Sequence, residues 1–329
     1  MDNLTHTLTG LMLSRAGLHR LTPRASLILM LAANAPDIDV VSLLGGMEVH
    51  LDWHRGFTHG LPSLPLMAAL PVLAAGMWRI PGAWLASCLG VISHLLLDWT
   101  NIYGIRLLSP ISQEWFRLDI TTVIDPWIWL VLLAAVAWPA LARLVSAEIG
   151  AKPQAGGGIA VLALAFVLLY NAGRAVLHSR AMAMLDSRVY QGGVPTQIAA
   201  LPHHLNPLRW RGVVELPGRW EVHTVDLAGE EFDPDAGRVW YQAAPSAAVD
   251  TARRTAPFAT LRRFSPMLLW RQVQLPGDGA PVEVKATDLR FGEPNEDNFT
   301  AKALVDAASG RVSESRLQLR GPSAPLVPH

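Results

Sequence analysis

The stretch AWLASCLGVISHLLLD, residues 83–98, decides how this chain must fold. It is almost wholly apolar and close to the length that a helix needs to cross a bilayer about 30 Å thick. His94 and Asp98 are four residues apart, so their side chains leave one face of such a helix together. Ionisable groups in apolar surroundings are costly unless something binds them. The stretch therefore predicts a membrane helix that carries part of a binding site.

Other blocks in the first half of the chain are equally poor in charge. Arg79 is the only formal charge from Leu61 to Leu97, and Asp125 is the only one from Ile120 to Leu141. Residues 153–173 contain none. These blocks predict a multi-pass membrane protein, whose main partner is the lipid bilayer, with about four spanning helices. We expect the spans over residues 61–78, 83–99, 124–142 and 159–177.

The composition changes after Arg180, where runs rich in Trp, Val and Arg alternate with Gly and Pro. This pattern is typical of antiparallel strands. The sequence therefore predicts a multi-domain protein, with an all-α membrane-embedded domain at residues 1–180 and a smaller β-rich extramembrane domain at residues 181–329. We expect its tryptophans to pack in a core; they are Trp210, Trp220, Trp240 and Trp270.

The totals exclude some classes of protein. The formal net charge is zero, so nothing favours a nucleic-acid partner. The single cysteine, Cys88, lies in an apolar block, which excludes a disulfide framework and a thiolate metal site.

Further metal-ligand types cluster around the first apolar blocks. Asp37 and Asp39 follow Pro36, and His54 and His59 lie five residues apart in a polar loop. Each pair alone has an ordinary explanation, such as a solvated helix end or a hydrogen-bonded histidine. Their joint occurrence with His94 and Asp98 favours a metal centre. The candidate ligands are His6, Asp37, Asp39, His54, His59, His94, Asp98 and, at second rank, Asp125.

The mixed His and Asp set indicates the kind of metal. Such ligands suit zinc best, with manganese or iron as alternatives, rather than magnesium or copper. Because there are more candidates than the four ligands of one zinc ion, we expect two or three ions that share carboxylates. Asp125 begins an apolar span, where capping the helix is an equally good explanation for a carboxylate.

At these motifs the sequence resembles the membrane-bound metal-dependent hydrolase family, the YdjM-like inner-membrane proteins. The matching segments are Thr5-His6 with Gly10, and residues 36–39, 54–59 and 93–98. The spacing is more distantly similar to that of zinc-dependent phospholipase C, an all-helical hydrolase with three zinc ions. One departure is Gly60, where the family often has serine; we expect it to alter contacts around the ligands but not the ligand set.

We therefore expect a hydrolase of the bacterial inner membrane that cleaves a phosphoester, or less favourably a carboxylic ester, through a metal-bound hydroxide. Asp39 would take the proton and Arg55 would hold the developing anion. A site at the membrane surface suggests a lipid or its head group as the substrate. The alternative is a non-catalytic metal-binding sensor or scaffold whose β domain binds a partner. A transporter is disfavoured because the ligands lie in loops and at helix ends.

Arginines near the spans set the expected orientation. We place Arg15, Arg20 and Arg24 on the side of the ligands, together with Arg55 and others that follow. Fewer basic residues, among them Arg79, lie on the opposite side. The positive-inside rule then predicts a cytoplasmic metal centre.

Overall fold

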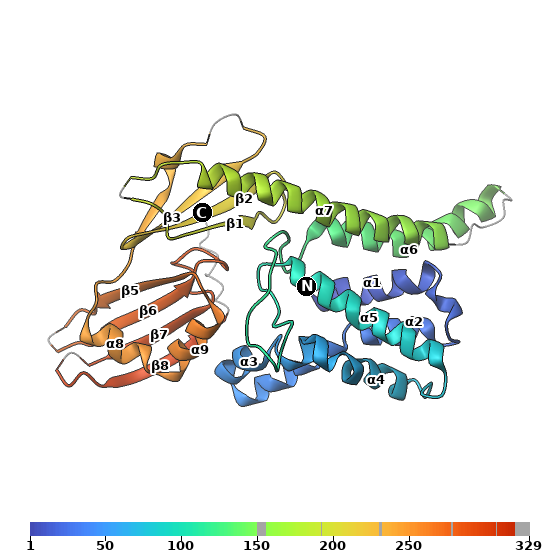
Figure 1. The fold of residues 1–329 in the computed structure, drawn as a ribbon, viewed down its shortest axis with the longest axis horizontal. Helices are drawn as coiled ribbons and strands as arrows, with labels where there is room; N and C mark the ends of the chain where they lie inside the picture. Colours follow the sequence, from blue (N-terminus) through green and yellow to red (C-terminus); the bar gives the residue numbers. More distant parts are fainter. Residues whose placement is uncertain (150–155, 192, 230–231, 278, 307, 320–329) are drawn as a thin grey trace. The chain divides into compact units, whose positions relative to one another are not determined.

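The computed structural model describes residues 1–149, 156–191, 193–229, 232–277, 279–306 and 308–319 (Figure 1). Contacts divide the chain into two compact units. The membrane unit comprises Met1–Val41, His54–Ala181 and Leu201–Trp210. The β unit comprises Ser42–Trp53, Met182–Ala200 and the chain from Arg211 onward. The predicted division at residue 180 stays a prediction, and these contacts assign residues 42–53 to the second unit.

Helices build the membrane unit. Its longer elements are α1 (Asn3–Arg15), α2 (Ala25–Ala32), α4 (Leu64–Ala74), α5 (Pro81–Thr100), α6 (Pro126–Ile149) and α7 (Gly157–Asp186). Short 3-10 helices connect them: η1 (Leu18–Arg20), η2 (Ala35–Gly45), η3 (Phe57–His59) and η4 (Leu61–Ser63). The N-cap of α1 is Asp2, whose carboxylate accepts the backbone N–H groups of Leu4 and Thr5.

Within the described residues, three helices are long and apolar enough to cross a membrane, namely α5, α6 and α7. The number rises to five if each of two bent helix pairs counts as one span. The predicted span at residues 61–78 is not one long helix, because α4 has only 11 residues. Proline at residues 62 and 65 opens this segment, and Gly76, with φ +67°, closes it. Proline cannot supply the backbone donor that a longer helix needs.

Glycines let the central helices of the membrane unit approach one another. A Cβ on Gly10 of α1 would lie 2.6 Å from the carbonyl oxygen of Leu29 on α2. A Cβ on Gly90 of α5 would lie 2.6 Å from the Cβ of Ala32 on the same helix α2. Close backbone approach over small residues is the usual way to pack helices in lipid. The helix α2 therefore packs against both α1 and α5.

The turn between α1 and α2 lies at the opposite end of α5 from Asp98. A Cβ on Gly82, near the start of α5, would lie 2.1 Å from the carbonyl oxygen of Leu21. The guanidinium of Arg24 donates to the carbonyl of Ala75 at 2.6 Å. The expectation that this turn shares a side with the ligands was therefore wrong. The arginine count no longer favours either side, and the cytoplasmic position of the centre stays a prediction.

The C-terminal half carries two four-stranded antiparallel sheets, each with its strands in sequential order (Figure 1). The first contains β1 (Gln197–Pro202), β2 (Arg209–Leu216), β3 (Arg219–Asp226) and β4 (Arg238–Tyr241). The second contains β5 (Leu268–Gln274), β6 (Val282–Asp288), β7 (Thr300–Val305) and β8 (Val312–Gln318). The short helices of the β unit are α3 (Met47–Trp53), α8 (Ala247–Arg253) and α9 (Ala256–Phe264), with η5 at Pro234–Ala236.

The predicted fold class, a helical domain followed by a β-rich one, is confirmed. Three of the four tryptophans are buried as expected, and Trp240 is half-buried. The segment from Asp288 to Phe291 has a clear structural role, because Arg290 makes a buried ion pair with Asp288 at 2.6 Å. Its guanidinium also lies 4.5 Å from the ring centre of Phe264.

Candidate metal centre

Four side chains from three elements of the membrane unit meet at one point. They are Asp37 from η2, His59 from η3, and His94 and Asp98 from α5, and their ligand atoms all lie within 4.8 Å of one another. The Nε2 of His59 is 3.5 Å from Asp37 Oδ1 and 3.4 Å from Asp98 Oδ2. The Nε2 of His94 is 3.7 Å and 3.5 Å from the same two oxygens. A tetrahedral zinc ion with bonds of about 2.0 Å separates its ligands by about 3.3 Å, so the spacing fits one ion.

The hydrogen bonds of the two histidines fix which nitrogen faces the centre. His94 Nδ1 lies 2.7 Å from the carbonyl oxygen of Ala33, so it carries the proton and donates. His59 Nδ1 faces the hydroxyl of Thr58 at 3.0 Å and Asp39 Oδ2 at 3.3 Å. Both Nε2 atoms therefore direct lone pairs inward, only 3.0 Å apart. Hydrogen-bond partners on the far nitrogen are what orient metal-bound histidines.

The electrostatics of these four side chains favour a bound cation. Two lone pairs and two carboxylates converge on a buried point, and His59, His94 and Asp98 have no exposed surface. Asp98 Oδ2 makes no hydrogen bond within the described ranges. A buried, unpaired carboxylate oxygen is costly in free energy. The donor set and its unsatisfied oxygen fit a divalent metal ion.

The second oxygen of Asp98 faces another set of groups. His6 Nε2 on α1 is 3.3 Å from Asp98 Oδ1, and the Met1 amino group also contacts this oxygen. The ring of His6 stacks on His94 with centres 3.8 Å apart. Neither ring nitrogen of His6 makes a hydrogen bond within the part of the chain described. Burial, followed by the nearby His94, lowers the pKa of His6, so its imidazole is neutral and able to bind metal.

Asp39 and His54 lie behind the four converging side chains. Asp39 Oδ1 is 2.8 Å from His54 Nδ1. Asp39 Oδ2 accepts the backbone N–H of Arg55 at 2.9 Å and the hydroxyl of Thr58 at 3.0 Å. These contacts shape the loop that presents His59. The roles of Asp39 and His54 as ligands, and of Asp39 as a base, stay predictions.

Arg55 is buried beside the centre, with φ at +54°. Its guanidinium donates to Asn101 Oδ1 at 3.0 Å and to the carbonyl of Gly104 at 3.2 Å, and lies 3.2 Å from Asp98 Oδ1. Its donors are thus directed largely at the protein itself. Holding a substrate anion stays a prediction for this residue.

The structure does not bring Asp125 into contact with the four side chains. Asp125 Oδ1 accepts the backbone N–H groups of Trp127 and Ile128 at 3.1 and 3.3 Å. Its Oδ2 accepts the hydroxyl of Tyr170 on α7 at 3.1 Å. These are the contacts of a cap at the start of α6, and a ligand role for Asp125 stays a prediction.

Sequence reasoning missed several supporting groups. Asn101 is fully buried and positions Arg55, and its place three residues after Asp98 was the available signal. Gly60 is glycine for a steric reason, because a Cβ there would lie 2.1 Å from the carbonyl oxygen of Ser109. The carbonyl of Ala33 carries no side-chain signal, so its role could not be read from the sequence.

Comparisons with known proteins agree with this location of the site. The model of the family described as "YdjM inner membrane protein" matches residues 1–181, which include every candidate ligand. The chain is 33% identical over 151 residues to the "Uncharacterized protein YfhP" of Bacillus subtilis (strain 168). That match covers 42% of this chain and 46% of the relative, so the chain spans about half of the relative's length. No solved structure matches the chain.

Proposed function

The chain belongs to the YdjM inner membrane protein family, and from that premise we propose that it is a metal-dependent hydrolase acting on a phosphoester of a lipid or lipid-linked substrate. The observation that carries the proposal is the convergence of Asp37, His59, His94 and Asp98 on one buried point. A divalent ion held there supplies Lewis acidity, which activates water and neutralises charge on a phosphoryl oxygen.

Zinc is the metal that we propose. Two imidazole nitrogens and two carboxylate oxygens suit zinc, manganese or iron, and the near-tetrahedral spacing favours zinc. Asp98 offers its second oxygen to His6, at 3.3 Å. That arrangement would let Asp98 bridge to a second ion.

The residues around the centre have distinct tasks in this proposal. Asp37 is the entry point, because its side chain is 14% exposed whereas those of His59 and His94 have no exposed surface. Asp39 orients His59 through Nδ1 and is the nearest further carboxylate that could accept a proton. Arg55 adds positive charge beside Asp98.

A trough beside Asp37 supports a lipid substrate. It has a volume of about 350 Å³, within the range of ligand pockets, and its walls are mostly apolar. Leu31 from α2, Ile38 from η2 and Leu70 from α4 line it, and Asp37 lies among them. An acyl chain in this trough would keep its head group next to the least buried ligand.

One observation favours the non-catalytic alternative. Four protein ligands complete the shell of a tetrahedral ion, as in structural zinc sites, whereas catalytic sites keep a position open. A metal-binding sensor or scaffold would need no open position. The two functions differ in turnover and share metal binding.

The decisive experiment measures hydrolysis by the detergent-purified chain. We expect release of p-nitrophenol from bis(p-nitrophenyl) phosphate, and release of head group from a bacterial lipid extract. Both activities should disappear with a chelator and return with added zinc, because the metal supplies the Lewis acid. Elemental analysis of the same sample gives the zinc content.

Each outcome separates the two functions. Bound zinc without turnover of either substrate would favour the sensor or scaffold. Turnover that persists at full rate in chelator would overturn the metal-dependent mechanism.

A further inference from the structure

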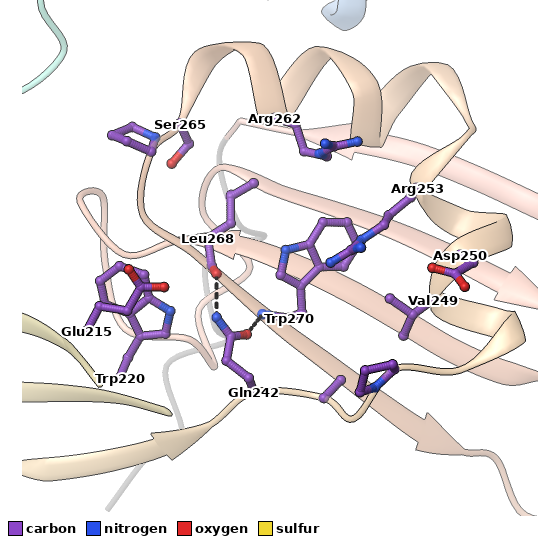
Figure 2. Close-up of a pocket in the computed structure, with 13 residues that line it drawn as sticks. Glu215, Trp220, Gln242, Val249, Asp250, Arg253, Arg262, Ser265, Leu268 and Trp270 are labelled. Carbon is purple, nitrogen blue, oxygen red and sulfur yellow. Dashed lines mark hydrogen bonds between the residues drawn. The ribbon is translucent and has the colours of Figure 1, made fainter. Parts of the chain in front are cut away.

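The β unit contains a cavity of about 440 Å³ that the proposed function does not use (Figure 2). Its walls come from β2, β3 and β5, the segment after β4, and helices α8 and α9. The apolar part of the lining includes Trp220, Val249, Leu268 and Trp270. Its volume is that of a site for a small organic ligand.

Hydrogen bonds fix one wall of this cavity. The side-chain amide of Gln242 donates to the carbonyl of Leu268 at 3.1 Å and accepts the backbone N–H of Trp270 at 2.7 Å (Figure 2). The ring of Trp270 stacks on Phe258 with centres 5.4 Å apart. The wall formed by these residues is therefore preorganised.

Two arginines reach the cavity from different helices. Arg253 ends α8, and its guanidinium lies over the ring of Trp270 at 4.9 Å, which leaves the N–H edges of the guanidinium available. Arg262 lies on α9 and lines the same cavity (Figure 2). Among the described residues, neither arginine has an ion pair. Their neighbour Arg263 does, because it contacts Asp52 on α3 at 2.6 Å.

Two carboxylates also line the cavity, and among the described residues neither forms an ion pair with these arginines. Glu215 accepts the hydroxyl of Thr196 at 2.9 Å. Asp250 is exposed on α8 and makes no ion pair within the described ranges. The guanidinium groups therefore remain available to an oxyanion, which arginine binds through two parallel N–H bonds.

We propose that this cavity binds a small organic oxyanion, with its phosphate or carboxylate on Arg253 and Arg262 and its apolar body against Leu268 and the tryptophans. The site belongs to the β unit, so it is independent of the hydrolase proposal.

The test is titration calorimetry of the full chain in non-ionic detergent, with phenyl phosphate as the probe. Metal is first removed with a chelator, and the chelator is then removed by gel filtration, because a bound metal ion would also bind phosphate and a chelator could compete for the arginines. Three control compounds are titrated in the same way. Benzyl alcohol keeps an aromatic ring but has no charge, inorganic phosphate has the charge but no ring, and benzyltrimethylammonium has a ring with a positive charge. We expect phenyl phosphate to bind more tightly than all three.

Variants locate the binding. Arg253→Gln and Arg262→Gln should each weaken phenyl phosphate binding by about tenfold or more, since each removes charged hydrogen bonds. Arg254→Gln is the matched control, because Arg254 is exposed and does not line the cavity, and its affinity should match the wild type. Circular dichroism checks that all three variants fold; Arg262 is exposed, so its replacement should leave the fold intact.

The outcomes decide the proposal. Equal binding of benzyl alcohol, tighter binding of the cation, no binding of phenyl phosphate at millimolar concentration, or unchanged affinity in both lining variants would overturn it. Displacement of phenyl phosphate by detergent-solubilised phosphatidylglycerol, but not by phosphatidylcholine, would support the two-arginine site and identify a lipid as the source of the phosphate.

Discussion

Replacing Asp98 with asparagine is expected to lower the affinity of the protein for zinc at least about 100-fold, the upper end of the effect of altering a group around a bound metal. Asp98 faces His59 and His94 with one oxygen and His6 with the other. The amide removes the negative charge of the carboxylate. It also puts an NH₂ group in place of one of the two oxygens, which face His6 on one side and His59 and His94 on the other. The asparagine side chain would still fill the same volume, so the helix α5 should persist.

The measurement is zinc content and competition with a chromogenic chelator, on protein purified in detergent. Asp125→Asn is the matched control, because Asp125 is also buried in the membrane unit but caps α6. We expect its zinc affinity to stay near that of the wild type. Equal loss in both variants would show that the effect is not specific to Asp98, and no loss in Asp98→Asn would remove the metal centre from this position.

Replacing Gly90 with valine is expected to destabilise the membrane unit by about 3 kcal/mol, the upper end for overpacking a core. The Cβ of the new residue would lie 2.6 Å from that of Ala32 and 3.1 Å from the carbonyl oxygen of Leu29. The helix α5 would have to move away from α2. His94, four residues further along, would then lose its hydrogen bond to Ala33, so zinc binding should also weaken.

Unfolding in detergent, followed by circular dichroism, measures the change in stability. Gly173→Val on α7 is the matched control, because a Cβ at Gly173 meets no atom within 4 Å. It should change the free energy of unfolding only by the helix-propensity difference, a gain of well under about 1 kcal/mol, because glycine is a poorer helix former than valine. If the two variants were equally stable, close packing of α5 on α2 would not be what holds His94 in place.

The sequence was most informative where chemistry and spacing agreed. His94 and Asp98 lie on one helix, so their shared face followed from geometry alone. Asp37 and His59 could be proposed only because ligand types are rare in apolar surroundings. The position of Asp39 and His54 behind the centre could not be predicted from the sequence. It depends on a tertiary contact, the hydrogen bond from the backbone N–H of Arg55 to Asp39 Oδ2.

Other features depended on tertiary contacts that no local pattern encodes. The segment predicted as a span at residues 61–78 contains the 11-residue helix α4, which is long enough to span only together with the bent segment before it. Arg24 was assigned to the wrong end because the turn before α2 folds back onto the start of α5, beside Gly82. The cavity that Arg253 and Arg262 line is built from two sheets and two helices. Its lining residues are scattered between positions 215 and 270, so they form no sequence motif.

The packing of residues 42–53 on the second unit affects how truncated forms of this protein will behave. The chain leaves the first unit after Val41 and returns to it at His54, and the residues in between pack with the second unit. Leu51 on α3 is 1% exposed, and α3 lies against α9 and β8. A gene shortened after α7 would therefore produce a fragment in which Leu51 is exposed to solvent. Leu51 lies in the segment that connects Asp39 to His54. Loss of solubility or of metal in such a fragment would reflect the exposure of Leu51, and would say little about metal binding by the intact chain.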